Sequence, residues 1–223
     1  MSVTMEVEDG TALITMDDGK ANAISHEMLD ALEPALSDAE ADDTVKAIVL
    51  AGREGKFCAG FDLKTMQGAA PADAAKLVNR GGVFAHQLFA CAKPVVGAAT
   101  GHGIAMGALL LLACDTRVGP NGAFKFGLNE TAIGMVMPRF GLELGKARLQ
   151  SAALTSAIVQ ARIYDSEGAV AAGYLDLLTN EDTIIGTALE IAAALGNLPA
   201  KAYAGNKKLV RKPFLKAMEK SLS

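Results

Sequence analysis

The sequence FCAGFDLK, residues 57–64, and the sequence GHGIAMG, residues 101–107, decide how this chain is interpreted. Each follows a short apolar run, residues 47–51 and residues 95–99, that has the length and composition of a buried strand. Small residues and glycines let a ligand approach the main chain closely. Two buried strands that end in such loops can point backbone N–H groups into one crevice, and two converging donors stabilise an oxyanion.

A dinucleotide site is a weaker interpretation of the same glycines. The fingerprint G-x-G-x-x-G requires a third glycine three residues after Gly103, and Gly107 comes one residue late. We therefore infer only a glycine-rich turn that exposes N–H groups at the start of a buried helix, without a dinucleotide site.

The rest of the first half alternates between strand and helix patterns. Asp9-Gly10 is typical of a tight hairpin turn, Ser25 is a candidate N-cap, and Pro71 can open a helix that Pro94 ends. These signals predict repeated β-β-α or β-α-β units in an α/β fold. The expected strands are 2–7, 11–16, 47–51, 95–99 and 116–119, and the expected helices follow Ser25, run from 71 toward 91, and cover 106–114; the chain from 140 onward is expected to be mostly helical.

Composition and charge exclude several classes of protein. Of the 223 residues 51% are hydrophobic and 21% are charged, which is typical of a folded globular domain. The net charge of −4 argues against a nucleic-acid-binding function, which needs many phosphate contacts. The isolated cysteines Cys58, Cys91 and Cys114 have no metal-ligand spacing and indicate a reducing compartment, so we expect a cytoplasmic protein without a metal site.

The uncharged stretch from Pro94 to Cys114 is long enough to span a bilayer. Gly97, Gly101 and Gly103 interrupt it, which favours a buried strand, a turn and a buried helix. We therefore expect no membrane span, and the N-terminus lacks the pattern of a signal peptide.

Positive charge is concentrated at the C-terminal end. Residues 201–223 contain seven basic side chains and one acidic side chain, which leaves this segment at +6 and the remainder at −10. A run of basic residues usually forms a solvated helix face, and a local anion site is the alternative. We place a core domain at 1–195 and a short basic helical segment at 196–223.

Four ordered motifs resemble those of the crotonase superfamily, the enoyl-CoA hydratases and isomerases. They are the two segments quoted above, the sequence KANA at 20–23 and the sequence GLNET at 127–131. The resemblance covers roughly residues 3–195. It implies a crotonase-like spiral of β-β-α units capped by helices, a homotrimer or dimer of trimers, and an acyl-CoA thioester as the substrate, with coenzyme A entering as part of that substrate and no other cofactor.

The resemblance also assigns residues to roles. It implies an oxyanion hole formed by the backbone N–H groups of Phe61 and Met106, and because the backbone acts, methionine can replace the glycine that hydratases often have there. It places the residues that hold the adenine and phosphates of coenzyme A at the positions occupied by Lys20, Ala21, Ala59 and Lys64.

The carboxylates decide which reaction is expected. The hydratase pattern has two glutamates that hold a water molecule; the second aligns with Glu130 and the first with Leu109. Leucine cannot orient or deprotonate water, whereas one carboxylate suffices to move a proton from C2 to C4 of a 3-enoyl-CoA. We expect a 3,2-enoyl-CoA isomerase whose Glu130 has a raised pKa in an apolar pocket built from Ile133, Met135 and Leu109. An enoyl-CoA hydratase and a non-catalytic acyl-CoA-binding protein are the alternatives.

The basic segment suggests one more contact. We expect Lys207, Lys208 or Arg211 to lie near the coenzyme A phosphates.

Asp62 and Asp115 are interpreted as turn and cap residues.

Overall fold

The structure, a computed structural model, describes residues 3–68 and 71–222. Within these residues two sheets form the centre, a six-stranded sheet in the order β1-β2-β3-β5-β7-β9 and a three-stranded sheet in the order β4-β6-β8. The strands are β1 Val3–Glu8, β2 Thr11–Met16, β3 Ala47–Gly52, β4 Gly55–Cys58, β5 Val95–Ala98, β6 Gly101–Ile104, β7 Thr116–Pro120, β8 Phe126–Gly127 and β9 Leu177–Thr179. The α-helices are α1 His26–Ala41, α2 Leu63–Gly68, α3 Pro71–Ala90, α4 Met106–Ala113, α5 Arg139–Arg148, α6 Ser166–Ala172, α7 Ile184–Gly196 and α8 Ala200–Leu222.

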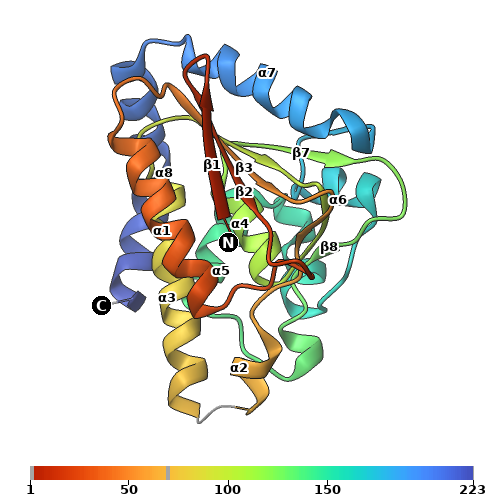
Figure 1. Cartoon of the computed structure of the whole chain (residues 1–223). Coiled ribbons are helices and arrows are strands. Elements are labelled where there is room, and N and C mark those ends of the chain that lie inside the picture. Colours follow the sequence, from red (N-terminus) through yellow and green to blue (C-terminus); the bar gives the residue numbers. More distant parts are fainter. Residues whose placement is uncertain (1–2, 69–70, 223) are drawn as a thin grey trace.

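Successive β-β-α units wind into a spiral (Figure 1). In the units that begin with β3, β5 and β7, the first strand joins the large sheet and the second joins the small sheet, before the chain enters a helix. Strands β1 and β2 pair antiparallel, and the other strand pairs are parallel. This is the α/β architecture that the sequence predicted.

Local sequence signals determine where the first elements begin and end. Asp9 and Gly10 both have positive φ, 48° and 77°, as the tight hairpin turn requires. The Ser25 side chain accepts a hydrogen bond from the Met28 N–H at 3.1 Å and so caps α1. Pro71 is the first residue of α3. These three predictions are confirmed.

The central strands of the large sheet, β3 and β5, are buried on both faces. Ile48 and Leu50 of β3 point into the main core beneath α1, α3 and α4, whereas Val49 and Ala51 pack with Ala188 of α7 on the opposite face. Alternation with a period of two explains why one strand serves both cores. Figure 1 shows α7 crossing the sheet alone, on the side away from α1 and α3.

The apolar stretch at 94–114 forms buried elements, as predicted. It contains β5, β6 and α4, and every residue of α4 is buried. Among the described residues no single helix is both long and apolar enough to cross a membrane; the segments Glu181–Gly196 and Ala200–Leu222 reach the criterion only together, with a bend of 103° between them.

The small sheet and β9 were not predicted. Residues 55–58 and 101–104, expected to be loops, form strands β4 and β6 that pair in parallel. A Cβ on Gly101 would lie 2.4 Å from the Gly55 oxygen, so glycine at this position permits the pairing. Strand β9 adds to the edge of the large sheet within a region that was expected to be helical.

Helix α8 packs along α3 and α5 at one side of the molecule (Figure 1). Its Met218 belongs to the main hydrophobic core, and Phe214 and Leu222 pack against that core. The C-terminal helix therefore contributes to the same core as the helices that precede it.

Candidate active site

The loop after β4 presents a backbone N–H group to the interior. Ile24 and Phe61 form a parallel bridge in which the Ile24 N–H donates to the Gly60 oxygen at 2.8 Å and the Asp62 N–H donates to the Ile24 oxygen at 2.9 Å. Because successive N–H groups of an extended chain point to opposite sides, the Phe61 N–H points away from Ile24. Within the described residues no backbone oxygen accepts from it.

The first turn of α4 supplies the second N–H group. Met106 is the first residue of the helix, and its N–H has no backbone acceptor in the described part of the chain, as expected for an N-terminal turn. The preceding Ala105 has φ 50° and ψ −118°, a strained conformation for a residue with a Cβ. Its N–H donates to the Gly127 oxygen at 2.9 Å, which helps to hold the turn in place.

Two glycines allow the loop and the helix to approach each other. A Cβ on Gly107 would lie 2.2 Å from the Cys58 oxygen, and a Cβ on Gly60 would lie 3.9 Å from the Met106 nitrogen. The Phe61 and Met106 side chains also meet at one place in α3, 2.5 Å and 3.5 Å from a Cβ built on Gly81. The structure therefore brings the two predicted oxyanion-hole residues together.

Glu130 is buried beside this pair. It directly precedes the 3₁₀ turn Thr131–Ile133, and only 7% of its surface is exposed. Its Oε2 atom is buried without a hydrogen-bond partner among the described residues. Burial raises the pKa of Glu130 above its ordinary value, as predicted, because the charged form loses hydration.

Glu130 and Phe61 line the same cavity, which has a volume of about 330 Å³. Leu109, Ile133 and Met135 also line it, so the apolar pocket predicted around the glutamate is confirmed. Leu109 is 1% exposed and contributes no polar atom. Glu130 and the oxyanion-hole loop therefore share a mostly apolar chamber of the size of a small-molecule site.

Two polar groups near Glu130 were missed by the sequence analysis. Asn129 lines the cavity, and its Oδ1 atom is buried without a partner in the described residues. Tyr174 is fully buried; burial raises the pKa of its hydroxyl, and the charges of Tyr164 and Glu130 add to this effect. The position of Asn129 next to Glu130 was the available signal, whereas nothing in the sequence connected Tyr174 to the site.

The residues expected to hold coenzyme A lie on both sides of the loop 59–64. Ala59 lines the cavity, and its N–H donates to the Ala21 oxygen at 3.1 Å. Lys20 and Lys64 line a surface depression of about 630 Å³ on the other side of this loop, together with Asp18 and other acidic residues. Ala59 thus lies at the cavity and is bonded to Ala21, whereas Lys20 and Lys64 lie at the depression.

Two of the three basic residues expected near the coenzyme A phosphates are engaged inside the fold, so that expectation stays a prediction for Lys208 alone. The Lys207 ammonium lies 2.6 Å from Asp115 Oδ2, and the Arg211 guanidinium lies 2.7 Å from Asp115 Oδ1. Both side chains are almost fully buried there, so their hydrogen-bonding groups are used inside the fold rather than beside Lys20 and Lys64. Lys208 is exposed.

Comparison with known proteins gives consistent matches. A family model described as enoyl-CoA hydratase/isomerase matches residues 6–223. The peroxisomal fatty acid beta-oxidation multifunctional protein AIM1 of Arabidopsis thaliana is 31% identical over 229 residues, which cover 99% of this chain but only 29% of that longer protein.

Solved structures agree over the whole chain. An enoyl-CoA hydratase from Mycobacterium ulcerans superposes with a TM-score of 0.96 at 36% identity, covering 100% of this chain and 96% of that one. An enoyl-CoA isomerase from Mycobacterium tuberculosis superposes with a TM-score of 0.94 at 37% identity, covering 99% and 96%.

The fold is that of the crotonase type, a class of acyl-CoA enzymes. The chain belongs to the enoyl-CoA hydratase/isomerase family. Both names occur among its relatives, so the choice between the two reactions rests on the carboxylates of the site.

Proposed function

We propose that this chain is a 3-enoyl-CoA to trans-2-enoyl-CoA isomerase. The observation that supports this most directly is that, among the described residues, Glu130 supplies the only carboxylate lining the cavity, where Leu109 stands in place of a second one. Moving a double bond requires one group that accepts a proton and returns it, and a carboxylate with a raised pKa is suited to both steps.

In the proposed reaction the Glu130 carboxylate removes a proton from C2 of the thioester. The electron pair of the broken C–H bond moves onto the thioester oxygen, and the N–H groups of Phe61 and Met106 donate hydrogen bonds to the resulting enolate. The protonated Glu130 then delivers the proton to C4 as the double bond shifts from C3–C4 to C2–C3. The proton and electrons balance within the substrate, so no cofactor is required beyond the coenzyme A that the substrate carries.

The remaining contacts of the proposal follow from the family resemblance. Lys20, Ala21, Ala59 and Lys64 hold the adenine and phosphates of the coenzyme A, with the thioester at the loop 59–64 and the acyl chain in the cavity of about 330 Å³. As the family resemblance implies, we also propose assembly as a homotrimer or a dimer of trimers, which light scattering can determine.

Hydration of a 2-enoyl-CoA is the second candidate, and one observation favours it. Asn129 Oδ1 is a buried acceptor without a partner in the described part of the chain, and Asn129 lines the same cavity as Glu130. An amide and a carboxylate can hold a water molecule between them, although only the carboxylate can deprotonate it. A protein that binds acyl-CoA without turnover is the third possibility.

A paired assay separates these functions. The purified chain and Glu130→Gln are each given 3-enoyl-CoA and trans-2-enoyl-CoA, with Glu167→Gln, an exposed acid, as the matched control. We expect double-bond migration in the native chain, a loss of roughly 10²- to 10⁴-fold in Glu130→Gln, and full activity in the control.

The other outcomes contradict the proposal in distinct ways. Hydration of trans-2-enoyl-CoA that exceeds isomerisation, and that falls when Asn129 is changed to Ala, would establish the hydratase. Tight thioester binding with no turnover of either substrate would establish the non-catalytic function.

A further inference from the structure

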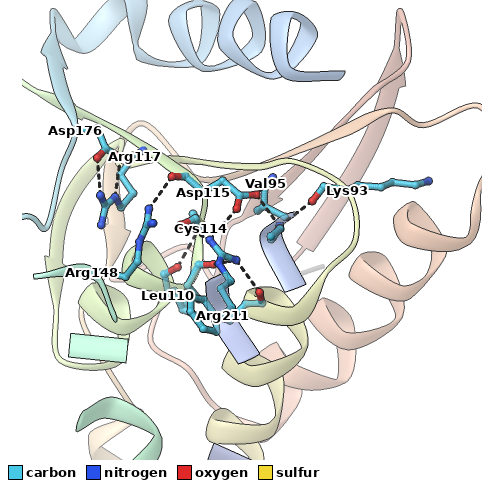
Figure 2. A network of polar contacts seen from close by, with 12 residues as sticks. Lys93, Val95, Leu110, Cys114, Asp115, Arg117, Arg148, Asp176 and Arg211 are labelled. Atoms are coloured by element: carbon cyan, nitrogen blue, oxygen red, sulfur yellow. Dashed lines mark hydrogen bonds and ion pairs between the residues drawn. The ribbon is translucent and has the colours of Figure 1, made fainter. Parts of the chain in front are cut away.

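A cluster of buried charges lies at the opposite end of α4 from the cavity (Figure 2). Its centre is Asp115, which follows α4 and precedes β7. Asp115 Oδ2 accepts hydrogen bonds from the Lys207 ammonium at 2.6 Å and from the Val95 N–H at 2.7 Å, and Oδ1 accepts from Arg211 at 2.7 Å. Asp115 is thus the centre of an ionic cluster, not the simple cap that the sequence indicated.

Two of the cations in this cluster have several acceptors. Arg211 also donates to the Phe89 oxygen at 2.6 Å, near the end of α3, and its guanidinium lies 4.1 Å from the centre of the Phe89 ring. Lys207 also donates to the Lys93 oxygen at 3.0 Å. Carbonyl oxygens at helix C-termini carry partial negative charge, so these contacts add to the compensation that Asp115 provides.

Arg148 is the exception. It ends α5, and its guanidinium donates to the Asp115 backbone oxygen at 2.6 Å. No carboxylate forms an ion pair with it within residues 3–68 and 71–222, and its Nε is buried without a partner there. Burial, reinforced by Arg117 and Arg211, lowers the pKa of Arg148 to about 10.

The neighbouring acid does not neutralise Arg148. Asp176 forms a two-pronged ion pair with Arg117, which donates to it from Nε at 2.8 Å as well as from Nη2. Among the described residues of this cluster, the four cations Arg117, Arg148, Lys207 and Arg211 face two carboxylates, Asp115 and Asp176, which leaves an excess of two positive charges. Buried charge without a counterion is costly, so an anion bound here would be stabilised.

A cavity of about 500 Å³ opens at this cluster, between α8, the end of α5 and the start of β7. Arg148, Lys207 and Arg211 line it, together with the polar side chain of Asn206. Asp115, Thr116 and Tyr203 also line it, and the remaining lining residues, among them Leu198, are apolar. The cavity thus combines converging cations with room for a small apolar body.

We propose that this cavity is a second ligand site, which binds a phosphate group either as free phosphate or as a phosphate monoester. The planar guanidinium of Arg148 can donate two parallel hydrogen bonds to a tetrahedral oxyanion. Lys207 and Asn206 line the same cavity. The apolar lining would contact the organic part of a monoester. The site is separate from the proposed coenzyme A contacts, since it shares no lining residue with the depression at Lys20 and Lys64.

Calorimetric titration of the full chain tests the site. Inorganic phosphate and adenosine monophosphate are titrated separately at constant ionic strength, so the two sources of the phosphate group are distinguished. We expect the native chain to bind at least one of them, and Arg148→Gln to bind it roughly ten- to a hundredfold more weakly, the effect of losing a charge-assisted hydrogen bond. Lys146→Gln, an exposed change two residues earlier in α5, should bind as the native chain does.

A second variant keeps the proposal testable if Arg148→Gln does not fold. Asn206→Asp places a carboxylate at the exposed mouth of the cavity, where it substitutes for the ligand. We expect its thermal stability without phosphate to exceed that of the native chain and its phosphate binding to be lost. Absence of binding to the native chain, or equal affinity in the native chain and the folded variants, would overturn the proposal.

Discussion

The two ends of helix α4 place buried carboxylates in opposite electrostatic surroundings. At the N-terminal end Glu130 has an oxygen without a partner among the described residues, and the free N–H groups of the first turn face the same region. At the C-terminal end Asp115 receives two cations, and Arg211 also approaches the Ala113 and Cys114 oxygens at 3.5 Å.

The contrast distinguishes the charged groups around Asp115, which stabilise the fold, from Glu130, which the proposed reaction uses. Cations at the helix C-terminus satisfy both Asp115 and the negative end of the helix dipole. Glu130 receives no such compensation among the described residues, and in the proposed reaction the N–H groups of Phe61 and Met106 would stabilise the negative charge that develops on the thioester oxygen. Local departures from ideal satisfaction of polar groups are typical of functional sites.

The largest expected effect on stability is at Asp115. Asp115→Asn leaves Lys207 and Arg211 buried without a carboxylate, and breaking a buried pair in this way costs about 3–5 kcal/mol. The free energy of unfolding, measured by urea denaturation, should fall by that amount, whereas Asp43→Asn at an exposed position should change it little. A loss below about 1 kcal/mol would show that carbonyl oxygens and solvent alone compensate the two cations.

The opposite sign is expected at the other end of the helix. Glu130→Gln removes a buried carboxylate whose Oε2 atom has no partner within residues 3–68 and 71–222, so the free energy of unfolding at neutral pH should rise by about 1–2 kcal/mol while activity is lost. Glu143→Gln is the matched comparison: Glu143 is equally buried, but it lies 2.7 Å from Arg139, so its replacement should lower stability.

The gain in Glu130→Gln should depend on pH. Because the folded state raises the pKa of Glu130, the folded protein binds this proton more tightly than the unfolded chain does, and the native chain loses stability as pH rises between the unfolded-state value and the raised value. The difference between the variant and the native chain should therefore shrink as pH falls toward the ordinary glutamate pKa of about 4.3. A difference that stays constant with pH would mean that Glu130 is not the group responsible.

The pH dependence of catalysis should follow the same group. The carboxylate must be ionised to remove the C2 proton, so kcat/KM for 3-enoyl-CoA should fall about tenfold per pH unit below the raised pKa of Glu130 and level off above it. The profile is measured with the free enzyme at low substrate concentration. A flat profile through the acidic range would show that another group takes the proton.

Sequence reasoning succeeded where neighbouring residues determine the structure. The turn at Asp9-Gly10 and the cap at Ser25 follow from the properties of those residues, and both are present. The single glutamate and Leu109 came from motif resemblance, and the structure places both at one cavity.

The missed features depend on distant partners. Strands β4 and β8 are four and two residues long and exist only through pairing with β6, so periodicity could not reveal them. Arg211 and Asp115 are 96 residues apart in sequence, and only the packing of α8 onto α3 and α5 brings them together. A basic run in the sequence therefore indicates neither which side chains are buried nor what they contact.

The smallest effects are expected at the exposed lysines of the proposed coenzyme A surface. Lys20→Gln and Lys64→Gln should each raise KM for the acyl-CoA about threefold, the magnitude of an exposed ionic contact, and should leave kcat unchanged because neither side chain lies at the cavity that holds Glu130. The effect should shrink at high salt. Lys76→Gln in α3 is the matched exposed control. An unchanged KM in the variant that carries both Lys20→Gln and Lys64→Gln would mean that the coenzyme A phosphates bind elsewhere. A fall in kcat instead would mean that this surface positions the thioester for proton transfer.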